Sequence, residues 1–302
     1  MEIPVQLIIL AQVLIVGIMM GAMYALMAIG ITFIAGIMKM INWSMGEFYM
    51  IGSFVQYNMI VRFLGPERWY LALPVSMASI FVLGLIIQRL LLATMYRYPE
   101  GNRFEYATII TIAISMLFQN LAIIIAGPYQ VSPKDYLPTI ALGDLGVSLN
   151  GSRLAGAIGA AVILLAFWYF IKKTMVGLSF LGTAQNRLGA QTAGIHLQRV
   201  DMIGFGIGVM LAAAAGALLA PVFLVHPLNG ATSTVKGFEI IVIGGLGSLP
   251  GAVIAAFGLA LVESLGSFYV NPSYQDLYGF VFLVAFLLIR PWGLFGERER
   301  RV

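Results

Sequence analysis

Long stretches without a charged residue constrain what this chain can fold into more than any other feature of its sequence. They cover residues 3–38, 48–61, 69–88, 106–133, 154–171, 202–235, 240–262 and 277–289. An unpaired charge at the centre of a bilayer costs several kcal/mol, and about 20 apolar residues are enough for one transmembrane helix. Most of these stretches therefore predict one membrane-spanning helix each, and the first could also hold a short additional piece.

The composition agrees with a membrane protein. Hydrophobic residues make up 60% of the 302 positions, charged residues make up 10%, and the mean hydropathy is +0.94, far outside the usual range for soluble domains. Because a transmembrane helix and its connection use about 30 residues, there is no room for a separate soluble domain. We expect an all-α polytopic fold with about eight hydrophobic segments, in which residues 1–302 form a single transmembrane domain embedded in the lipid bilayer.

What the sequence lacks excludes several chemistries. Without cysteine the chain cannot form disulfides, iron–sulfur clusters or cysteine nucleophiles. No lysine follows a glycine, which excludes a P-loop, and His196 and His226 are too far apart for a clustered metal set. We predict no catalytic residue, no metal and no cofactor bound by this chain. The formal charge of +4 lies in particular loops and indicates membrane orientation, with no nucleic-acid partner.

The basic residues predict the orientation. Eleven of the seventeen lie in three connections, around Arg89, Arg97 and Arg103, around Lys172, Lys173, Arg187 and Arg199, and in the tail with Arg290, Arg298, Arg300 and Arg301. Since short cytoplasmic loops are enriched in Lys and Arg, we expect these connections and the C-terminus to be cytoplasmic. Residues 226–276 must then begin and end outside, which requires two passes or a re-entrant hairpin.

Glycine and proline interrupt two apolar segments. In the C-terminal half, the run 238–244 meets the turn 245–251; in the N-terminal half, a short apolar piece at 30–40 is followed by a polar turn at 42–47 and a longer helix from residue 48. Backbone groups exposed at bilayer depth need protein or water partners, so two interrupted or re-entrant helices are expected to border a transport pathway. The alternative is that Gly and Pro only kink packed helices. The corresponding places of the two interruptions suggest an internal repeat.

Polar side chains adjoin these interruptions. The ionisable ones are Glu47, Lys236, Glu239 and Glu263. Such groups are costly at bilayer depth and mark a pathway, an ion pair or a hinge, with snorkelling to the interface as the alternative for Lys236. Thr111, Ser115 and Gln119 share one helical face, and we favour hydrogen bonding between helices over a polar route as their role.

Several blocks of sequence resemble a known family. They are Gly21-Ala22-Met23-Tyr24-Ala25-Leu26 with Gly30-Ile31-Thr32, Ile41-Asn42 with Gly46-Glu47-Phe48-Tyr49-Met50, Gly177-Leu178-Ser179 with Ala184-Gln185-Asn186-Arg187 and Ala193-Gly194-Ile195, Lys236-Gly237-Phe238 with the glycine-rich turn at 244–252, and Arg290-Pro291-Trp292-Gly293-Leu294-Phe295-Gly296. In order and spacing these blocks resemble the branched-chain amino acid permease family of ABC importers over essentially the whole chain.

The resemblance implies a permease subunit that passes a small solute inward by alternating access, most often a branched-chain or other amino acid. It implies as partners a second homologous permease, two ATP-binding subunits that use the ATP, and an extracytoplasmic solute-binding protein. The expected location is the cytoplasmic (inner) membrane of a bacterium or archaeon. The outside loop at about 127–151 is a candidate docking surface for the binding protein, and a plain surface loop is the alternative.

The resemblance also implies site residues. The connection at about 172–200 corresponds to the cytoplasmic coupling segment, with ATPase contacts expected at Ala184, Gln185, Asn186, Ala193, Gly194 and Ile195. For the solute pathway we predict Asn42, Ser44, Glu47, Gly244, Gly245, Gly247 and Ser248.

One position departs from the family pattern. The family's turn usually reads Asn-Phe-Ala-His-Gly-Glu, and in this chain Met45 replaces the titratable His. Related permeases carry other amino acids, urea or amides, so the solute stays open at this point. An ion-coupled secondary transporter or a channel is the alternative of a different class, since it would share interrupted helices and intramembrane carboxylates.

Overall fold

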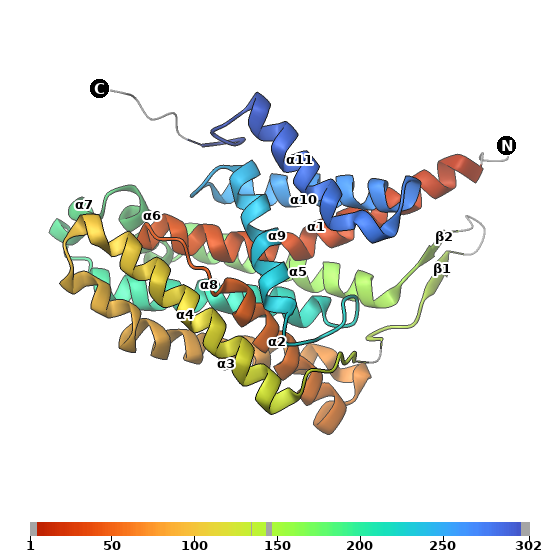
Figure 1. The fold of residues 1–302 in the computed structure, drawn as a ribbon, viewed down its shortest axis with the longest axis horizontal. Helices are drawn as coiled ribbons and strands as arrows, with labels where there is room; N and C mark the ends of the chain where they lie inside the picture. The colour runs from red at the N-terminus through yellow and green to blue at the C-terminus, as the bar shows by residue number, and fades with distance from the viewer. Residues whose placement is uncertain (1–4, 134, 143–146, 297–302) are drawn as a thin grey trace.

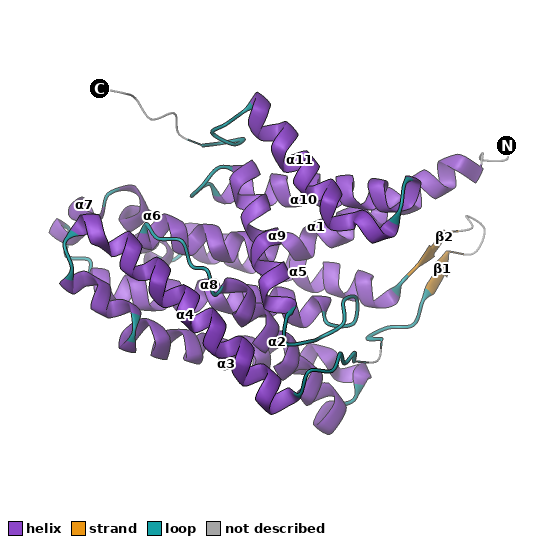
Figure 2. Ribbon diagram, viewed as in Figure 1, coloured by secondary structure: helices purple, strands orange, loops and turns teal. Residues whose placement is uncertain are grey.

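The computed structural model describes residues 5–133, 135–142 and 147–296, which form a bundle of helices with one short hairpin (Figures 1 and 2). Its α-helices are α1 Val5–Met38, α2 Met45–Met59, α3 Trp69–Leu90, α4 Glu100–Ala126, α5 Gly151–Lys173, α6 Met175–Gln185, α7 Arg187–Thr192, α8 Leu197–Leu219, α9 Asn229–Gly244, α10 Leu249–Tyr269 and α11 Gln275–Ile289. The antiparallel strands are β1 Ile140–Leu142 and β2 Val147–Leu149. Arg298, Arg300 and Arg301, used above to predict orientation, lie outside the described residues.

Seven of the described helical segments are long and apolar enough to cross a membrane. They are Gln6–Met38, Pro66–Arg97, Asn102–Ala126, Gly151–Lys173, Leu197–Leu219, Leu249–Tyr269 and Pro272–Ile289. The helices α2 and α9 have 15 and 16 residues. At 1.5 Å per residue they reach only about 24 Å, which is less than the roughly 30 Å of hydrocarbon in a bilayer. The predicted all-α polytopic fold is confirmed, and the two short helices adjoin the predicted interruptions.

The first helix is longer than the sequence predicted. We expected a separate short piece at 30–40, but α1 continues without a break from Val5 to Met38, so this prediction was wrong. Gly30 serves close packing and does not interrupt the helix, because a Cβ at Gly30 would lie 2.5 Å from the carbonyl oxygen of Gly208 in α8. The break lies instead between α1 and α2, at residues 39–44.

Helix α8 forms the centre of the bundle and packs against α1, α2 and α3. Its run 211–219 is entirely buried. Small residues let the neighbouring backbones approach: Gly208 meets Ile34 and Gly30 of α1, and Gly216 meets the carbonyl of Tyr49 in α2. Close packing through small residues is typical of membrane proteins, because lipid tails are as apolar as the helices and burial alone does not bring helices together.

The bundle has two distinct ends. In Figure 1, α6 and α7 lie at the end where α1 finishes, and the hairpin lies beside the N-terminal end of α1. Hydrogen bonds agree with this view: Arg187 Nη1 donates to the carbonyl of Ile37 at 2.6 Å, and Gln12 Nε2 donates to the carbonyl of Ser148 at 2.9 Å. The connection at 172–200 and the loop at 127–151 therefore occupy opposite ends, and which end faces the cytoplasm stays a prediction.

Helix α9 runs steeply across α1 and α10 in Figure 1 and leads into α10 through a tight turn. It ends at Gly244, and Gly245 and Gly247 have φ of 94° and 86°, which glycine adopts without steric cost. The backbone amides of Leu294 and Phe295 donate to the carbonyls of Ile243 and Gly244 at 2.8 and 3.2 Å. The last carbonyls of α9 thus obtain partners from the C-terminal segment, as backbone groups at a buried helix end require.

Replacing Gly52 by Ala should destabilise the bundle. The added Cβ would lie 2.6 Å from the Cα of Ala213, so α2 and α8 would have to move apart, and overpacking of this kind costs about 1–3 kcal/mol. Thermal unfolding of the purified protein in detergent measures the loss. Gly36→Ala is the matched control, because no atom lies within 4 Å of its added Cβ. Equal unfolding midpoints for both variants would contradict the close α2–α8 contact.

Candidate functional site

A buried polar connection joins α1 to α2. Its side chains bond to one another: Asn42 Oδ1 accepts hydrogen bonds from the backbone amide of Ser44 at 3.0 Å and from its hydroxyl at 2.7 Å. Asn42 and Ser44 are both buried. The side chain of Asn42 therefore supplies the hydrogen-bond acceptor for this turn, which lies between two helices.

Helices α4 and α9 hold this connection from two sides. Thr111 of α4 accepts from the amide of Trp43 at 3.3 Å, and Thr234 of α9 accepts from the amide of Gly46 at 2.9 Å. Ser115 of α4 donates to Glu47 Oε1 at 2.9 Å. The preferred role of this stripe, hydrogen bonding between helices, is confirmed for Ser115, whereas Thr111 bonds to the connection before α2.

Glu47 lies in the first turn of α2 with only 1% of its surface exposed. Its Oε1 has Ser115 as partner, whereas its Oε2 and the Nδ2 of Asn42 have no hydrogen-bond partner among the described residues. The first turn of α9 lies against it, since a Cβ at Gly230 would be 2.1 Å from Oε2. Two buried polar atoms without partners beside a short helix make this the strongest candidate point for contact with a ligand or a proton.

A second group of ionisable side chains joins four helices. Lys236 of α9 lies 2.5 Å from Glu263 of α10, 2.9 Å from Asp276 of α11 and 3.7 Å from Glu239. The hydroxyl of Tyr24 in α1 donates to Glu263 Oε2 at 3.2 Å. We call Lys236, Glu239, Glu263 and Asp276 the ionic cluster.

The sequence singled out three members of the ionic cluster but missed Asp276 and the contact from Tyr24. Asp276 directly precedes a charge-free stretch, which is the signal that could have marked it. Because Glu47 bonds to Ser115 of α4 and lies against Gly230 of α9, the four ionisable residues predicted together belong to two different sites.

The predicted pathway residues fall into two groups at opposite ends of α9. Asn42, Ser44 and Glu47 lie near its N-terminal half, through Gly230 and Thr234. The others form the α9–α10 turn: Gly244, Gly245, Gly247 and Ser248, whose hydroxyl accepts from the amide of Gly251 at 3.1 Å and caps α10. Ten residues of helix separate Thr234 from Gly244, which corresponds to about 15 Å. The structure therefore does not bring these seven residues into one site.

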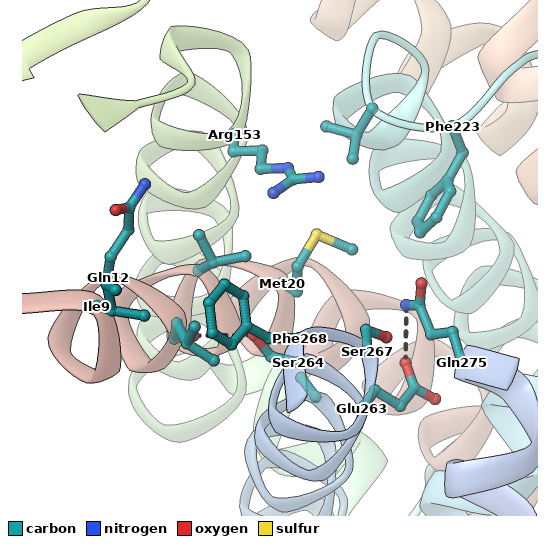
Figure 3. A pocket seen from close by; sticks show the side chains of 14 residues that line it. Ile9, Gln12, Met20, Arg153, Phe223, Glu263, Ser264, Ser267, Phe268 and Gln275 are labelled. Atoms are coloured by element: carbon teal, nitrogen blue, oxygen red, sulfur yellow. Dashed lines mark hydrogen bonds between the residues drawn. The ribbon is translucent and has the colours of Figure 1, made fainter. Parts of the chain in front are cut away.

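Two larger cavities adjoin the ionic cluster, beside a smaller one of about 340 Å³ that Lys236, Glu239 and Asp276 line. One, of about 490 Å³, is lined by Tyr24, Tyr49, Lys236 and Asp276 among others. The other, of about 460 Å³, is lined by Glu263 and residues of α1, α5 and α10 (Figure 3). Both share Val222, Phe223 and Gln275. Their volumes lie in the range of small-molecule sites.

The predicted coupling residues surround the short helix α7 at one end of the bundle. Gln185, Asn186, Ala193 and Gly194 are exposed, and Ala184 and Ile195 are half-buried. Asn186 caps α7 by accepting from the amide of Gly189 at 2.8 Å, and Gly194 has a φ of 85°. Leu188 also points outward with 73% of its surface exposed. This end therefore offers a compact set of exposed groups to a partner.

Arg187 links α7, at this end of the bundle, to α1 and α8. Its guanidinium donates to the carboxylate of Asp201 in α8 at 2.7 and 3.0 Å, to the hydroxyl of Tyr96 at 3.2 Å and to the carbonyl of Ile37 in α1. Asp201 is buried and also accepts from Tyr96. Burial opposes the charge of Arg187, but the hydrogen bonds and charge of Asp201 outweigh it and raise the pKa of the guanidinium. The sequence did not single out Asp201, although it directly precedes the charge-free stretch at 202–235.

The sequence of this chain matches a known family from residue 13 to residue 289, and that family is described as the branched-chain amino acid transport system, permease component. The chain belongs to this family. The resemblance seen in the sequence is thereby confirmed, and the protein is a transport permease.

Two relatives match the permease over nearly its whole length. The high-affinity branched-chain amino acid transport system permease protein LivH of Escherichia coli is 31% identical over 294 residues, which covers 94% of each chain. The corresponding BraD of Pseudomonas aeruginosa is 28% identical over 303 residues, which covers 95% of this chain and 96% of that protein. A solved structure, PsaBC from Streptococcus pneumoniae in complex with Fab, covers 93% of this chain and 91% of its own with a TM-score of 0.49 and 14% identity, which is too distant to carry an argument.

In this permease, replacing Arg187 by Met should lower the free energy of unfolding by about 3 kcal/mol, because the buried carboxylate of Asp201 would lose its cation. Titration with a denaturing detergent measures the loss. Arg199→Met is the control, since Arg199 is exposed. The double variant Arg187→Met with Asp201→Leu should recover most of the stability, since it leaves no unpaired charge. Equal losses for Arg187→Met and Arg199→Met would contradict the anchoring role.

Proposed function

We propose that this chain is the membrane-spanning permease subunit of an ABC importer that carries branched-chain amino acids inward. The observation that carries the proposal is the family match over residues 13–289, together with relatives named as branched-chain amino acid permeases along 94% or more of this chain. The long apolar helices and the polar contacts between them are what such a subunit needs in a bilayer.

The energy for transport comes from partner subunits in this proposal. Two ATP-binding subunits use the ATP, a second homologous permease completes the membrane part, and an extracytoplasmic protein delivers the solute. The permease itself has no ATPase site and no enzymatic activity. The exposed end around α7, with Ala184, Gln185, Asn186, Ala193, Gly194 and Ile195, receives the motion of the ATPases, and Arg187 transmits it to α1 and α8.

The orientation follows from the basic connections. The coupling segment at 172–200 and the C-terminus face the cytoplasm, and the loop at 127–151 faces outward, where the solute-binding protein docks. Support comes from the opposite ends that the two connections occupy (Figure 1) and from the preference of Lys and Arg for cytoplasmic loops. The membrane is the inner membrane of a bacterium or archaeon.

The solute pathway in this proposal borders the polar connection of Asn42, Ser44 and Glu47, and the α9–α10 turn with Gly244, Gly245, Gly247 and Ser248 lies where the helices hinge. The unpartnered atoms of Asn42 and Glu47 support the first part, and the positive φ of Gly245 and Gly247 supports the second. Alternating access would then open one end of the bundle as the other closes.

Purification of the tagged chain from its native membrane tests the function. We expect a second permease and two ATP-binding subunits to accompany it, and the complex in vesicles should take up leucine only with ATP and a solute-binding protein. Uptake of urea or an amide in place of leucine would assign the other solutes considered above. A chain that purifies alone and moves solute under an ion gradient would replace the proposal with a secondary transporter.

In the same assay, Glu47→Gln should reduce the rate of leucine uptake at least about tenfold, because the exchange keeps the shape of the side chain but removes the buried carboxyl group that is the candidate contact for a solute or a proton, a contact worth about 1.5–3 kcal/mol when it is charge-assisted. Glu67→Gln is the control, since Glu67 is exposed in the turn Pro66–Arg68. Unchanged uptake by a normally folded Glu47→Gln complex would remove Glu47 from the pathway.

Gly194→Glu should abolish ATP hydrolysis stimulated by the loaded binding protein, because an unpaired carboxylate would be buried against the ATPase. Gly194→Ala is the matched control: both variants place a side chain at a φ of 85° and share its cost of about 1–2 kcal/mol, but only Glu adds a charge. We expect Gly194→Ala to keep most of the stimulated hydrolysis. Equal rates for the two variants would exclude Gly194 from the ATPase contact.

A further inference from the structure

The 460 Å³ cavity of Figure 3 opens between the outer parts of α1, α5 and α10, at the hairpin end of the bundle. None of the pathway residues predicted from the sequence lines it. It lies beside Gln12, which holds the hairpin through Ser148, so it faces the side from which an importer would receive its solute.

One wall of the cavity carries a cation that has no partner among the described residues. Arg153, in the first turn of α5, is half-buried and points into the space (Figure 3). Its guanidinium makes no hydrogen bond and no ion pair with any residue that the structure describes. A guanidinium held partly out of water is stabilised strongly by a carboxylate, which it binds through two parallel hydrogen bonds.

The opposite wall is acidic. Glu263 lies there, with Gln275 donating to its Oε2 at 3.2 Å (Figure 3). Glu263 belongs to the ionic cluster, in which one lysine faces three carboxylates, so an excess of negative charge lies behind this wall. Ser267 lines the same side, and its buried hydroxyl has no hydrogen-bond partner among the described residues. The cavity is therefore positive at one end and negative at the other.

Aliphatic and aromatic side chains close the rest of the cavity. Val13, Val16 and Met20 of α1 line it, together with Phe223 and Phe268. An apolar side chain of a bound molecule would lose contact with water here, which favours binding.

We propose that this cavity binds an α-amino acid as its zwitterion, with the carboxylate at Arg153, the ammonium group at the wall of Glu263 and Ser267, and the aliphatic side chain against Val16 and Met20. The class of solute rests on the proposed function, whereas the site and its two charged walls come from the contacts just described. The cavity is the first site on the permease for a solute released by the binding protein.

Binding of radiolabelled L-leucine to the assembled transporter in nanodiscs, without binding protein and without ATP, tests this site by equilibrium dialysis. Arg153→Gln should weaken binding at least about tenfold, the loss expected when a charge-assisted pair is removed. Arg153→Lys should recover part of the affinity, because it keeps the charge but loses the planar fork. Arg62→Gln, at an exposed position that does not line the cavity, should bind like wild type, and equal basal ATP hydrolysis shows that all variants assemble.

Competition separates a zwitterion site from simpler sites. Unlabelled 4-methylpentanoate, which lacks the ammonium group, and 3-methylbutylamine, which lacks the carboxylate, should each displace leucine at least about tenfold less well than leucine itself, since each forfeits one charged contact. Equal displacement by 4-methylpentanoate would overturn the proposal in favour of a plain anion site. Loss of leucine binding when phosphatidylethanolamine replaces phosphatidylcholine in the nanodiscs would overturn it in favour of a lipid headgroup.

Uptake by the wild-type complex separates this inference from the proposed function. If the complex imports leucine with ATP but Arg153→Gln binds leucine as Arg62→Gln does, the cavity assignment is overturned and the function stands. If the complex imports no branched-chain amino acid, the function fails, and leucine binding that depends on Arg153 would still support the cavity.

Discussion

Where a helix ends inside a bilayer, its free backbone amides and carbonyls must find hydrogen-bond partners within the protein. The architecture of this permease depends on how these partners are supplied. Between α1 and α2 the partners are side chains: Asn42, Thr111 and Thr234 accept from three successive parts of the connection. At the end of α9 the partners are backbone amides of Leu294 and Phe295. At each helix break, another helix or the C-terminal segment therefore packs close enough to supply the missing hydrogen bonds.

Buried charged side chains also need partners within the protein, and an unpaired one costs more free energy than an unpaired backbone group. The ionic cluster ties α1, α9, α10 and α11 together, and Arg187 with Asp201 ties α7 to α8 and α1. Lys236, Glu239, Glu263 and Asp201 are buried, Arg187 is half-buried and Asp276 is exposed, and in each group a single cation contacts several helices. Moving α9 away from α10, or α7 away from α8, would leave a buried carboxylate without its cation, which costs several kcal/mol. The helices attached to one cation therefore move together, as the alternating access of an importer requires.

The long helices and the family follow from the sequence, because charge-free length and ordered motifs are properties of consecutive residues. The continuity of α1 through Gly30 cannot be predicted from consecutive residues. Gly30 is needed for close contact with the carbonyl of Gly208, which lies far along the chain. For the same reason the sequence proposed Lys236, Glu239 and Glu263 but missed Tyr24 and Asp276, whose roles arise only when α1 and α11 pack beside α9. It also grouped Glu47 with the α9–α10 turn, although the length of α9 separates them.

The two hydrogen bonds from the amides of Leu294 and Phe295 to the end of α9 have a consequence for biosynthesis. Ile243 and Gly244 precede α10 and α11 in the chain, so their carbonyls gain the amides of Leu294 and Phe295 only after both helices have been synthesised. Gly293, whose φ is 79°, turns the chain back toward Gly245 so that these two hydrogen bonds can form. The end of α9 thus obtains these two partners only after Leu294 and Phe295 have been made, and a chain truncated before Leu294 would leave both carbonyls without them.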